Sequence, residues 1–243
     1  MRMNDPLSTA WGTLADLEAD LITCRRCPRL VAWREETAQT RRRAYRDQEY
    51  WGRPVPAFGD PQARLLVVGL APGAHGSNRT GRMFTGDASG DFLYPALYRA
   101  GFASQPNQVG RGDGMALRDL LISAVGRCAP PDNRPTPEEV RTCLPYLRAE
   151  MALLPDLQGI VALGQIAFQY VLEIYRQTGA AIPALAFGHG AFYRLGEGLP
   201  WLLASYHPSR QNTQTGRLTA DMFDQIWLQA KDLLDGTVTD RAA

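Results

Sequence analysis

The chain has 243 residues, of which 45% are hydrophobic and 21% charged, and its formal net charge is +1. This length and composition predict one soluble globular domain over residues 1–243 with its own core. No apolar run approaches the ~20 residues that a membrane span needs, and the first residues lack the apolar segment of an export signal. We therefore expect a cytoplasmic monomer with no membrane partner, and flexible ends at residues 1–10 and 236–243.

The first part of the chain predicts two helices. One carries leucines at spacings of three and four between residues 14 and 21, with Ser8 or Thr9 as its expected N-cap. The second covers residues 28–40. Basic residues also gather here, because the segment 24–53 holds nine arginines against four acidic residues, with several aromatic residues among them. Such a patch suits either a phosphate backbone or a solvated helical face.

Four apolar runs predict the strands of a sheet: residues 65–68, 120–125, 159–164 and 200–205. Predicted helices alternate with them, at residues 91–100, 137–154, 165–176 and in a last segment with apolar residues from 218 to 230 on one face. This alternation predicts an α/β fold, a three-layer α/β/α sandwich with a central, mainly parallel four-stranded sheet. Residues 184–195 predict a hairpin or an extra strand.

The first of these runs leads into a loop that contains Gly69, Gly73 and Gly76. Glycine permits positive φ and close backbone approach, and an open α/β sheet binds its ligand at the carboxyl ends of its strands. The loop lacks both the P-loop sequence and the dinucleotide fingerprint G-x-G-x-x-G. Glycine content alone therefore leaves a phosphate or nucleotide role and a plain tight turn equally open.

The cysteines of the chain stand in two separated segments: Cys24 and Cys27, which form C-x-x-C, and Cys128 and Cys143. A disulfide framework is not expected in a long chain without an export signal. Four thiolates in two segments suit a tetrahedral zinc ion or a 4Fe–4S cluster. Residues 136–139 predict a helix start with a capping box, so a shared metal would hold both ends of the loop 129–136.

Three loops stand at the carboxyl ends of predicted strands: GLAPGAHG with RMFTGDASG, CAPPDNRPTPEE, and SYHPSRQNTQTG. In this order, and with the four cysteines, they resemble the uracil-DNA glycosylase superfamily in its iron–sulfur branches, families 4 and 5. Family 4 enzymes carry in the first motif an acidic residue that orients the attacking water. Here Ala71 stands in Gly-Leu-Ala-Pro-Gly, which with residues 75–81 and 85–90 is similar to the family 5 (B-type) pattern.

The resemblance implies a monofunctional glycosylase of base excision repair. Such an enzyme flips uracil and other deaminated bases out of damaged double-stranded DNA and hydrolyses the N-glycosidic bond. It also implies that the four cysteines hold a structural 4Fe–4S cluster. Two alternatives stay open: a strict uracil enzyme of the family 4 kind, and a non-catalytic iron–sulfur DNA-binding module.

The resemblance also implies two catalytic residues. His207, in His-Pro-Ser, matches the histidine that donates to O2 of the pyrimidine, and its alternative is a structural histidine. Asp87 is the nearest carboxylate in the motifs that can position water or offset positive charge on the sugar, since residue 71 is not acidic. Its position also suits a helix N-cap.

Five residues are implied to contact the flipped base: Ala71, Gly73, His75, Phe84 and Asn133. Phe84 would stack on the base, and the amide of Asn133 would read its Watson–Crick edge. A core phenylalanine and a turn asparagine are the alternatives, and His75 either contacts substrate or braces its loop. The residues implied to bind DNA are Arg210, Gln211, Asn212 and Arg217. His189 is expected to have a structural or rim role.

Overall fold

Four fully buried strands form the centre of the fold in the computed structural model, which describes residues 10–237. They are β2 (Leu65–Gly69), β3 (Leu120–Ala124), β4 (Gly159–Leu163) and β6 (Trp201–Ser205). All three pairings among them are parallel, as predicted. Strands buried on both faces read as continuous apolar runs, and this made them recognisable in the sequence.

Two short antiparallel strands extend the sheet at its edges. β1 (Phe58–Gly59) pairs with β3, and β5 (Phe192–Arg194) pairs with β6, so the strand order is β1-β3-β2-β4-β6-β5. The sheet therefore has six strands rather than the predicted four. β1 is too short to produce an alternating pattern, whereas β5 lies in the region where a hairpin or an extra strand was predicted.

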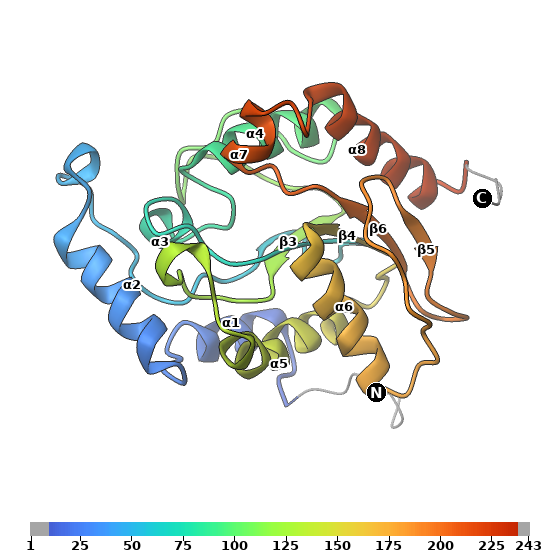
Figure 1. Ribbon diagram of the computed structural model, residues 1–243, viewed down its shortest axis with the longest axis horizontal. Coiled ribbons are helices and arrows are strands. Elements are labelled where there is room, and N and C mark those ends of the chain that lie inside the picture. The colour runs from blue at the N-terminus through green and yellow to red at the C-terminus, as the bar shows by residue number, and fades with distance from the viewer. Residues whose placement is uncertain (1–9, 238–243) are drawn as a thin grey trace.

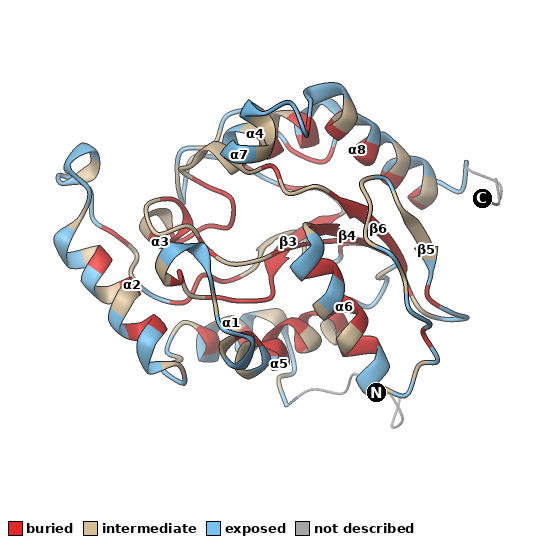
Figure 2. Ribbon diagram, viewed as in Figure 1, coloured by how far each residue is buried: buried red, intermediate tan, exposed pale blue. Residues whose placement is uncertain are grey.

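Helices cover both faces of the sheet, which confirms the three-layer α/β/α architecture (Figure 1). One face packs against α4 (Ala88–Arg99) and α8 (Ala220–Leu234), and the other against α5 (Pro137–Leu153) and α6 (Gln165–Gln177). Successive strand residues point to opposite faces of the sheet. Val67 therefore packs in the core on the α4 and α8 face, and Leu66 packs in the core on the α5 and α6 face. In Figure 2 the strands are coloured as buried, and so are the helix faces that are turned toward them.

The N-terminal helices lie outside this sandwich. α1 (Leu14–Leu21) packs Leu17 and Leu21 against Tyr146 of α5. Its N-cap is Thr13, whose side chain accepts from the backbone N–H of Asp16, while the predicted caps Ser8 and Thr9 lie outside the described residues. α2 (Pro28–Thr40) has the predicted bounds and projects away from the sheet, followed by the 3-10 helix η1 (Arg43–Tyr45) (Figure 1).

The structure corrects several predicted boundaries. α4 begins at Ala88 rather than residue 91, with Asp87 as its N-cap and Pro95 inside it. α5 has the predicted capping box between Thr136 and Glu139. Three short helices occupy predicted loops, because segments of three to five residues are too short to show helical periodicity: α3 (Ser77–Thr80), η2 (Pro131–Asn133) and α7 (Arg210–Gln214).

Among the described residues, no helix is long and apolar enough to cross a bilayer. The ends that were predicted to be flexible lie for the most part outside the described residues. Of those positions, only 10, 236 and 237 are described.

Candidate active site

One cavity of about 1030 Å³ opens between the loops that follow β2, β3 and β6. These are the carboxyl ends of parallel strands, where open α/β sheets place their ligands. Every residue that was predicted to be catalytic or base-binding lines this cavity: Ala71, Gly73, His75, Phe84, Asp87, Asn133 and His207. The fold therefore brings together residues from three distant segments of the chain.

The aromatic face of the cavity is formed by Phe84. Its side chain is largely buried, and its ring centroid lies 5.7 Å from that of His207, at an interplanar angle of 30°. The backbone of Phe84 has φ of 51°, a conformation that costs a non-glycine residue about 1–3 kcal/mol. Gly69 makes room for the ring, because a Cβ at Gly69 would lie 2.7 Å from Phe84 Cζ. Phe84 thus belongs to the buried core on the α4 and α8 face and also lines the cavity.

The two carboxylate oxygens of Asp87 have different surroundings. Oδ1 caps α4 by accepting from the backbone N–H groups of Ser89 (3.0 Å) and Gly90 (3.3 Å). Oδ2 faces the glycine loop, where a Cβ at Gly73 would lie 2.8 Å away and a Cβ at Gly76 would overlap it. Burial raises the pKa of Asp87, and the two backbone hydrogen bonds oppose that shift. Asp87 is thus an N-cap, and it also presents a free oxygen to the cavity.

His207 is held as a neutral imidazole. Burial lowers its pKa to about 4, because a charged ring would lose its hydration there. Its loop is braced by Asn212, whose Nδ2 donates to the carbonyl of His207 at 2.8 Å, and by Ser209, which caps α7. The predicted DNA-binding residue Asn212 therefore supports His207 from within the loop.

Two further histidines have distinct environments. His75 lines the cavity and pairs through Nδ1 with the hydroxyl of the buried Tyr50 at 3.0 Å. Burial lowers the pKa of His75, and the charges of Arg42 and Arg79 lower it further. His189 has the expected structural role, because its Nδ1 accepts from the backbone N–H of Tyr206 and its Nε2 lies 3.2 Å from the carbonyl of Met222. It anchors the end of β6 just before His207.

The amide of Asn133 stands at the exposed rim of the cavity. Both Asn133 and its neighbour Asp132 have positive φ, 55° and 54°. Neither angle is visible in a sequence, although asparagine and aspartate tolerate this region better than other non-glycine residues. Asp132 also lines the cavity and was not among the predicted residues.

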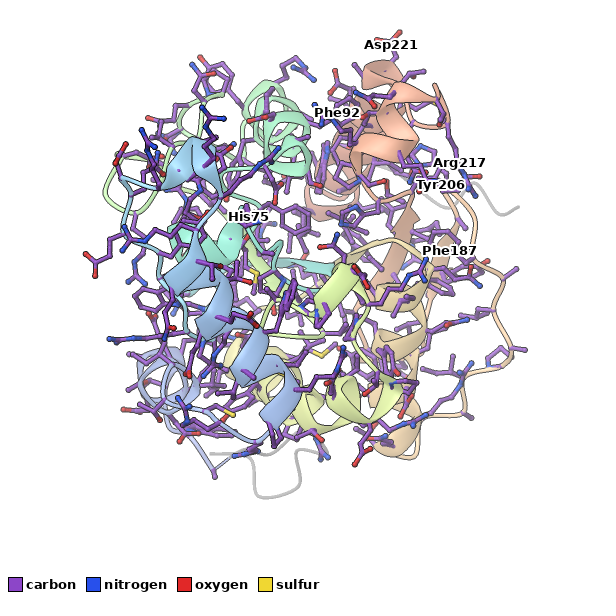
Figure 3. All side chains as sticks on the ribbon, turned by 60° about the vertical axis from the view of Figure 1, so that its left-hand side comes forward. His75, Phe92, Phe187, Tyr206, Arg217 and Asp221 are labelled. Carbon is purple, nitrogen blue, oxygen red and sulfur yellow. The ribbon has the colours of Figure 1, made fainter. Side chains whose placement is uncertain are left out.

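The predicted DNA-binding residues separate into two groups. Arg210 and Gln211 line the cavity at the start of α7. Arg217 instead lies over the ring of Tyr206, 4.6 Å from its centroid (Figure 3), and is not among the described residues that line the cavity. Two rim residues outside the predicted set, Arg42 and Tyr45, come from the basic and aromatic segment 24–53. The composition of that segment was the signal that pointed to them.

The four cysteines line a second, narrow cavity between α1, α2 and the start of α5. Its wall is largely apolar and includes Leu30, Val31 and Val140. Burial raises the pKa of Cys128 to about 11 and that of Cys143 to about 12. Without a bound cation, these thiols therefore stay protonated at neutral pH.

The residues around this second cavity fit an iron–sulfur cluster better than a single ion. Its donor set is four cysteine thiols from two segments of the chain, which is the number of protein ligands that such a cluster takes. A zinc ion needs each sulfur at about 2.3 Å, whereas a cluster with one thiolate on each iron accepts sulfurs that stand further apart. A positive charge also lies next to the thiols, because the buried side chain of Arg34 donates from Nη1 to Cys128 Sγ at 2.9 Å.

Comparison with known proteins agrees with this geometry. The family model of the Uracil DNA glycosylase superfamily matches residues 56–231. Type-5 uracil-DNA glycosylases of Thermus thermophilus, Mycobacterium bovis and Pyrobaculum aerophilum are 56%, 53% and 46% identical to the chain. These matches cover 88%, 91% and 91% of this chain, and 94%, 82% and 94% of the three relatives. The chain therefore belongs to the uracil-DNA glycosylase superfamily, in its type-5 branch.

Proposed function

We propose that this glycosylase removes uracil and also other deaminated bases from double-stranded DNA, leaving an abasic site. The observation that carries the proposal is the large cavity in which an aromatic face, an amide, a neutral imidazole and a free carboxylate oxygen converge. Its volume exceeds what one pyrimidine fills, and its first motif, Gly-Leu-Ala-Pro-Gly, carries no acid, unlike that of the strict uracil enzymes of family 4. Both features favour a broad range of bases.

The proposed chemical step separates charge across the cavity. As the N-glycosidic bond breaks, negative charge develops on the departing base and positive charge on the sugar. His207, neutral at physiological pH, donates a hydrogen bond to the base, and a preorganised donor acts most strongly where charge develops. Oδ2 of Asp87 holds the attacking water or offsets the charge on the sugar. Phe84 stacks on the flipped base, and Asn133 reads its edge.

The rim of the cavity supports contact with the DNA backbone. Arg210 and Gln211 approach it from α7, and Arg42 approaches it from the end of the basic segment 24–53. Arginine side chains at such a rim bind phosphates and make affinity depend on salt. A monomeric state and a cytoplasmic location are further parts of the proposal, and both rest on the sequence alone.

The four cysteines are proposed to hold a 4Fe–4S cluster with a structural role. The cluster would supply cationic iron that lets buried thiols bind as thiolates. Cys24 and Cys27 come from the α1–α2 connection, while Cys128 and Cys143 flank the loop that carries Asn133. A cluster bound by all four cysteines would therefore connect the N-terminal helices to a loop of the 1030 Å³ cavity, which is called the base cavity below because we propose that it holds the flipped base.

The test is single-turnover base release from duplexes that carry one uracil, hypoxanthine or xanthine, followed by cleavage at the abasic site. We expect release from all three duplexes and none from undamaged DNA. Release of uracil alone would favour the strict uracil enzyme. Binding without release of any base would favour the non-catalytic module. Iron and sulfide analysis with absorbance near 400 nm tests the cluster separately, and a colourless, zinc-loaded, active protein would contradict it.

A further inference from the structure

The side chain of Arg34 is a buried charge placed against one of the cysteines. It comes from the middle of α2 and is 2% exposed. Its Nη1 donates to Cys128 Sγ at 2.9 Å, and its Nη2 donates to the carbonyl of Cys24 at 3.1 Å. One guanidinium therefore bridges the two cysteine segments. Cys128 lies 94 positions after Arg34 in the sequence.

Carboxylates only partly balance this charge. Glu35 lies 3.8 Å from Arg34 Nη2, while it forms a much closer pair with the exposed Arg25, at 2.5 Å. Arg127, the other buried arginine at this cavity, pairs through Nη2 with the equally buried Glu150, while its Nε and Nη1 have no hydrogen-bond partner among the described residues. Burial of an arginine without a close anion is expensive, and a neutral thiol is a weak acceptor. The closest acceptors of the Arg34 guanidinium are therefore the sulfur of Cys128 and the carbonyl of Cys24, one from each cysteine segment.

We propose that Arg34 is a positioning residue of the metal centre, which holds Cys128 as a thiolate ligand and fixes its direction. This inference rests on the metal centre proposed above. A hydrogen bond from a cation stabilises an anionic sulfur and orients it, and the removal of such outer partners commonly lowers metal affinity about 10–100-fold. Charge and hydrogen bonds at ligand sulfurs also set the reduction potential of an iron–sulfur cluster.

The backbone of Arg34 makes a separate contact toward the base cavity. Nδ2 of the fully buried Asn78 donates to the Arg34 carbonyl at 3.2 Å, just after the loop that carries His75. A side-chain substitution keeps this carbonyl. Changes at the metal centre can therefore be separated from changes in the base cavity.

The experiment compares the holoprotein with Arg34→Gln, Arg34→Lys and the control Arg25→Gln. Arg25 also pairs with Glu35, but its side chain is 63% exposed and makes no hydrogen bond to a cysteine sulfur within residues 10–237. The readouts are the rate of metal release to an excess of coloured chelator and the reduction potential of the bound centre. Circular dichroism and uracil release confirm that each variant is folded.

Arg34→Gln is expected to release metal about 10–100-fold faster. Its reduction potential should fall, because loss of a positive charge favours the oxidised centre. Arg34→Lys should lie between Arg34→Gln and wild type, and Arg25→Gln should match wild type. Wild-type release and potential in Arg34→Gln would overturn the inference while leaving the metal centre intact. A metal-free but active wild-type protein would instead contradict the metal centre itself, and Arg34's role with it.

Discussion

The base cavity and the four-cysteine cavity are built in opposite ways. In the base cavity, Phe84, Asp132 and Asn133 are held at positive φ by loops at the ends of β2 and β3. Around the thiols two of the supports are regular helices, with Cys27 as the N-cap of α2 and Cys143 inside α5, while Cys24 and Cys128 lie in the connections that precede these helices. Strained loops suit a site that must match a transition state, whereas helices suit a centre that only has to hold segments together.

Burial has the same physical effect in both regions, with opposite consequences. It lowers the pKa of His207 to about 4 and raises that of Cys143 to about 12, because it disfavours the charged form of each group. For His207 the neutral form is the hydrogen-bond donor in the proposed reaction. For the cysteines the neutral form binds no metal, so the proposed metal centre would need positive charge nearby to hold them as thiolates. The predictions below test this contrast, from the largest expected effect on the chemical step to the smallest.

His207→Ala should have the largest effect. Loss of an oriented donor to the departing base should lower the single-turnover rate of uracil release by about 10²–10³. Binding to damaged duplex should be retained, since the cavity and Phe84 remain. His189→Ala removes a histidine that lies outside the cavity lining and holds the backbone of Tyr206, and it should lower the rate less than His207→Ala does. A His207→Ala variant with a wild-type rate would restrict this residue to a structural role.

Asp87→Asn should lower the single-turnover rate by about 10², the lower end of what a positioned acid or base contributes. Melting temperature should stay near that of wild type, because the amide oxygen can still cap α4. Near-normal activity in a normally stable variant would leave Asp87 as a helix cap alone.

The pH dependence gives an independent test of Asp87. Burial raises its pKa above the ordinary value, so the carboxylate is lost as pH falls through that raised pKa. The wild-type rate should therefore decline on the acidic side as Asp87 takes up a proton. Asp87→Asn should lack this decline. An acidic limb that persists unchanged in the variant would assign the titration to another group.

Gly76→Ala should lower the rate about tenfold, since small displacements of a catalytic group are costly. The new Cβ would overlap Oδ2 of Asp87 and push the carboxylate out of place. Gly73→Ala should have a smaller effect, because its Cβ would lie 2.8 Å from the same oxygen. Equal, wild-type rates for both variants would show that the position of Oδ2 is unimportant.

Asn133→Asp should change base preference by about tenfold, the size expected when one buried hydrogen bond worth about 1–3 kcal/mol is lost. An amide both donates and accepts, whereas a carboxylate only accepts. The measurement is the ratio of single-turnover rates on uracil and hypoxanthine duplexes. An unchanged ratio would reduce Asn133 to a turn residue.

Cys143→Ser should have the smallest effect on the chemical step. We expect a lower soluble yield and loss of the bound metal, with a single-turnover rate within about threefold of wild type for the protein that stays folded, because the thiols lie outside the base cavity. A large fall in rate at normal solubility would mean that the two regions are coupled in catalysis.

Local sequence patterns determined the central strands and several helix boundaries of this protein. Continuous apolar runs identified the four parallel strands, Pro28 and Thr40 bounded α2, and the capping box started α5. The resemblance identified the residues that line the base cavity and the four cysteines. These features depend on residues close together in the chain, or on motifs short enough to recognise in it.

Only the tertiary structure decided how these residues meet. Asp87 faces Gly73 and Gly76, Asn212 turns inward to His207, and Arg217 lies over Tyr206 away from the cavity. The edge strands, too, exist only because longer neighbours offer them hydrogen bonds. The bond from Arg34 to Cys128 joins residues 94 positions apart. The contacts of the edge strands and of Arg34 depend on packing between distant segments, and those within the loops depend on how each loop turns. No local periodicity or propensity encodes either.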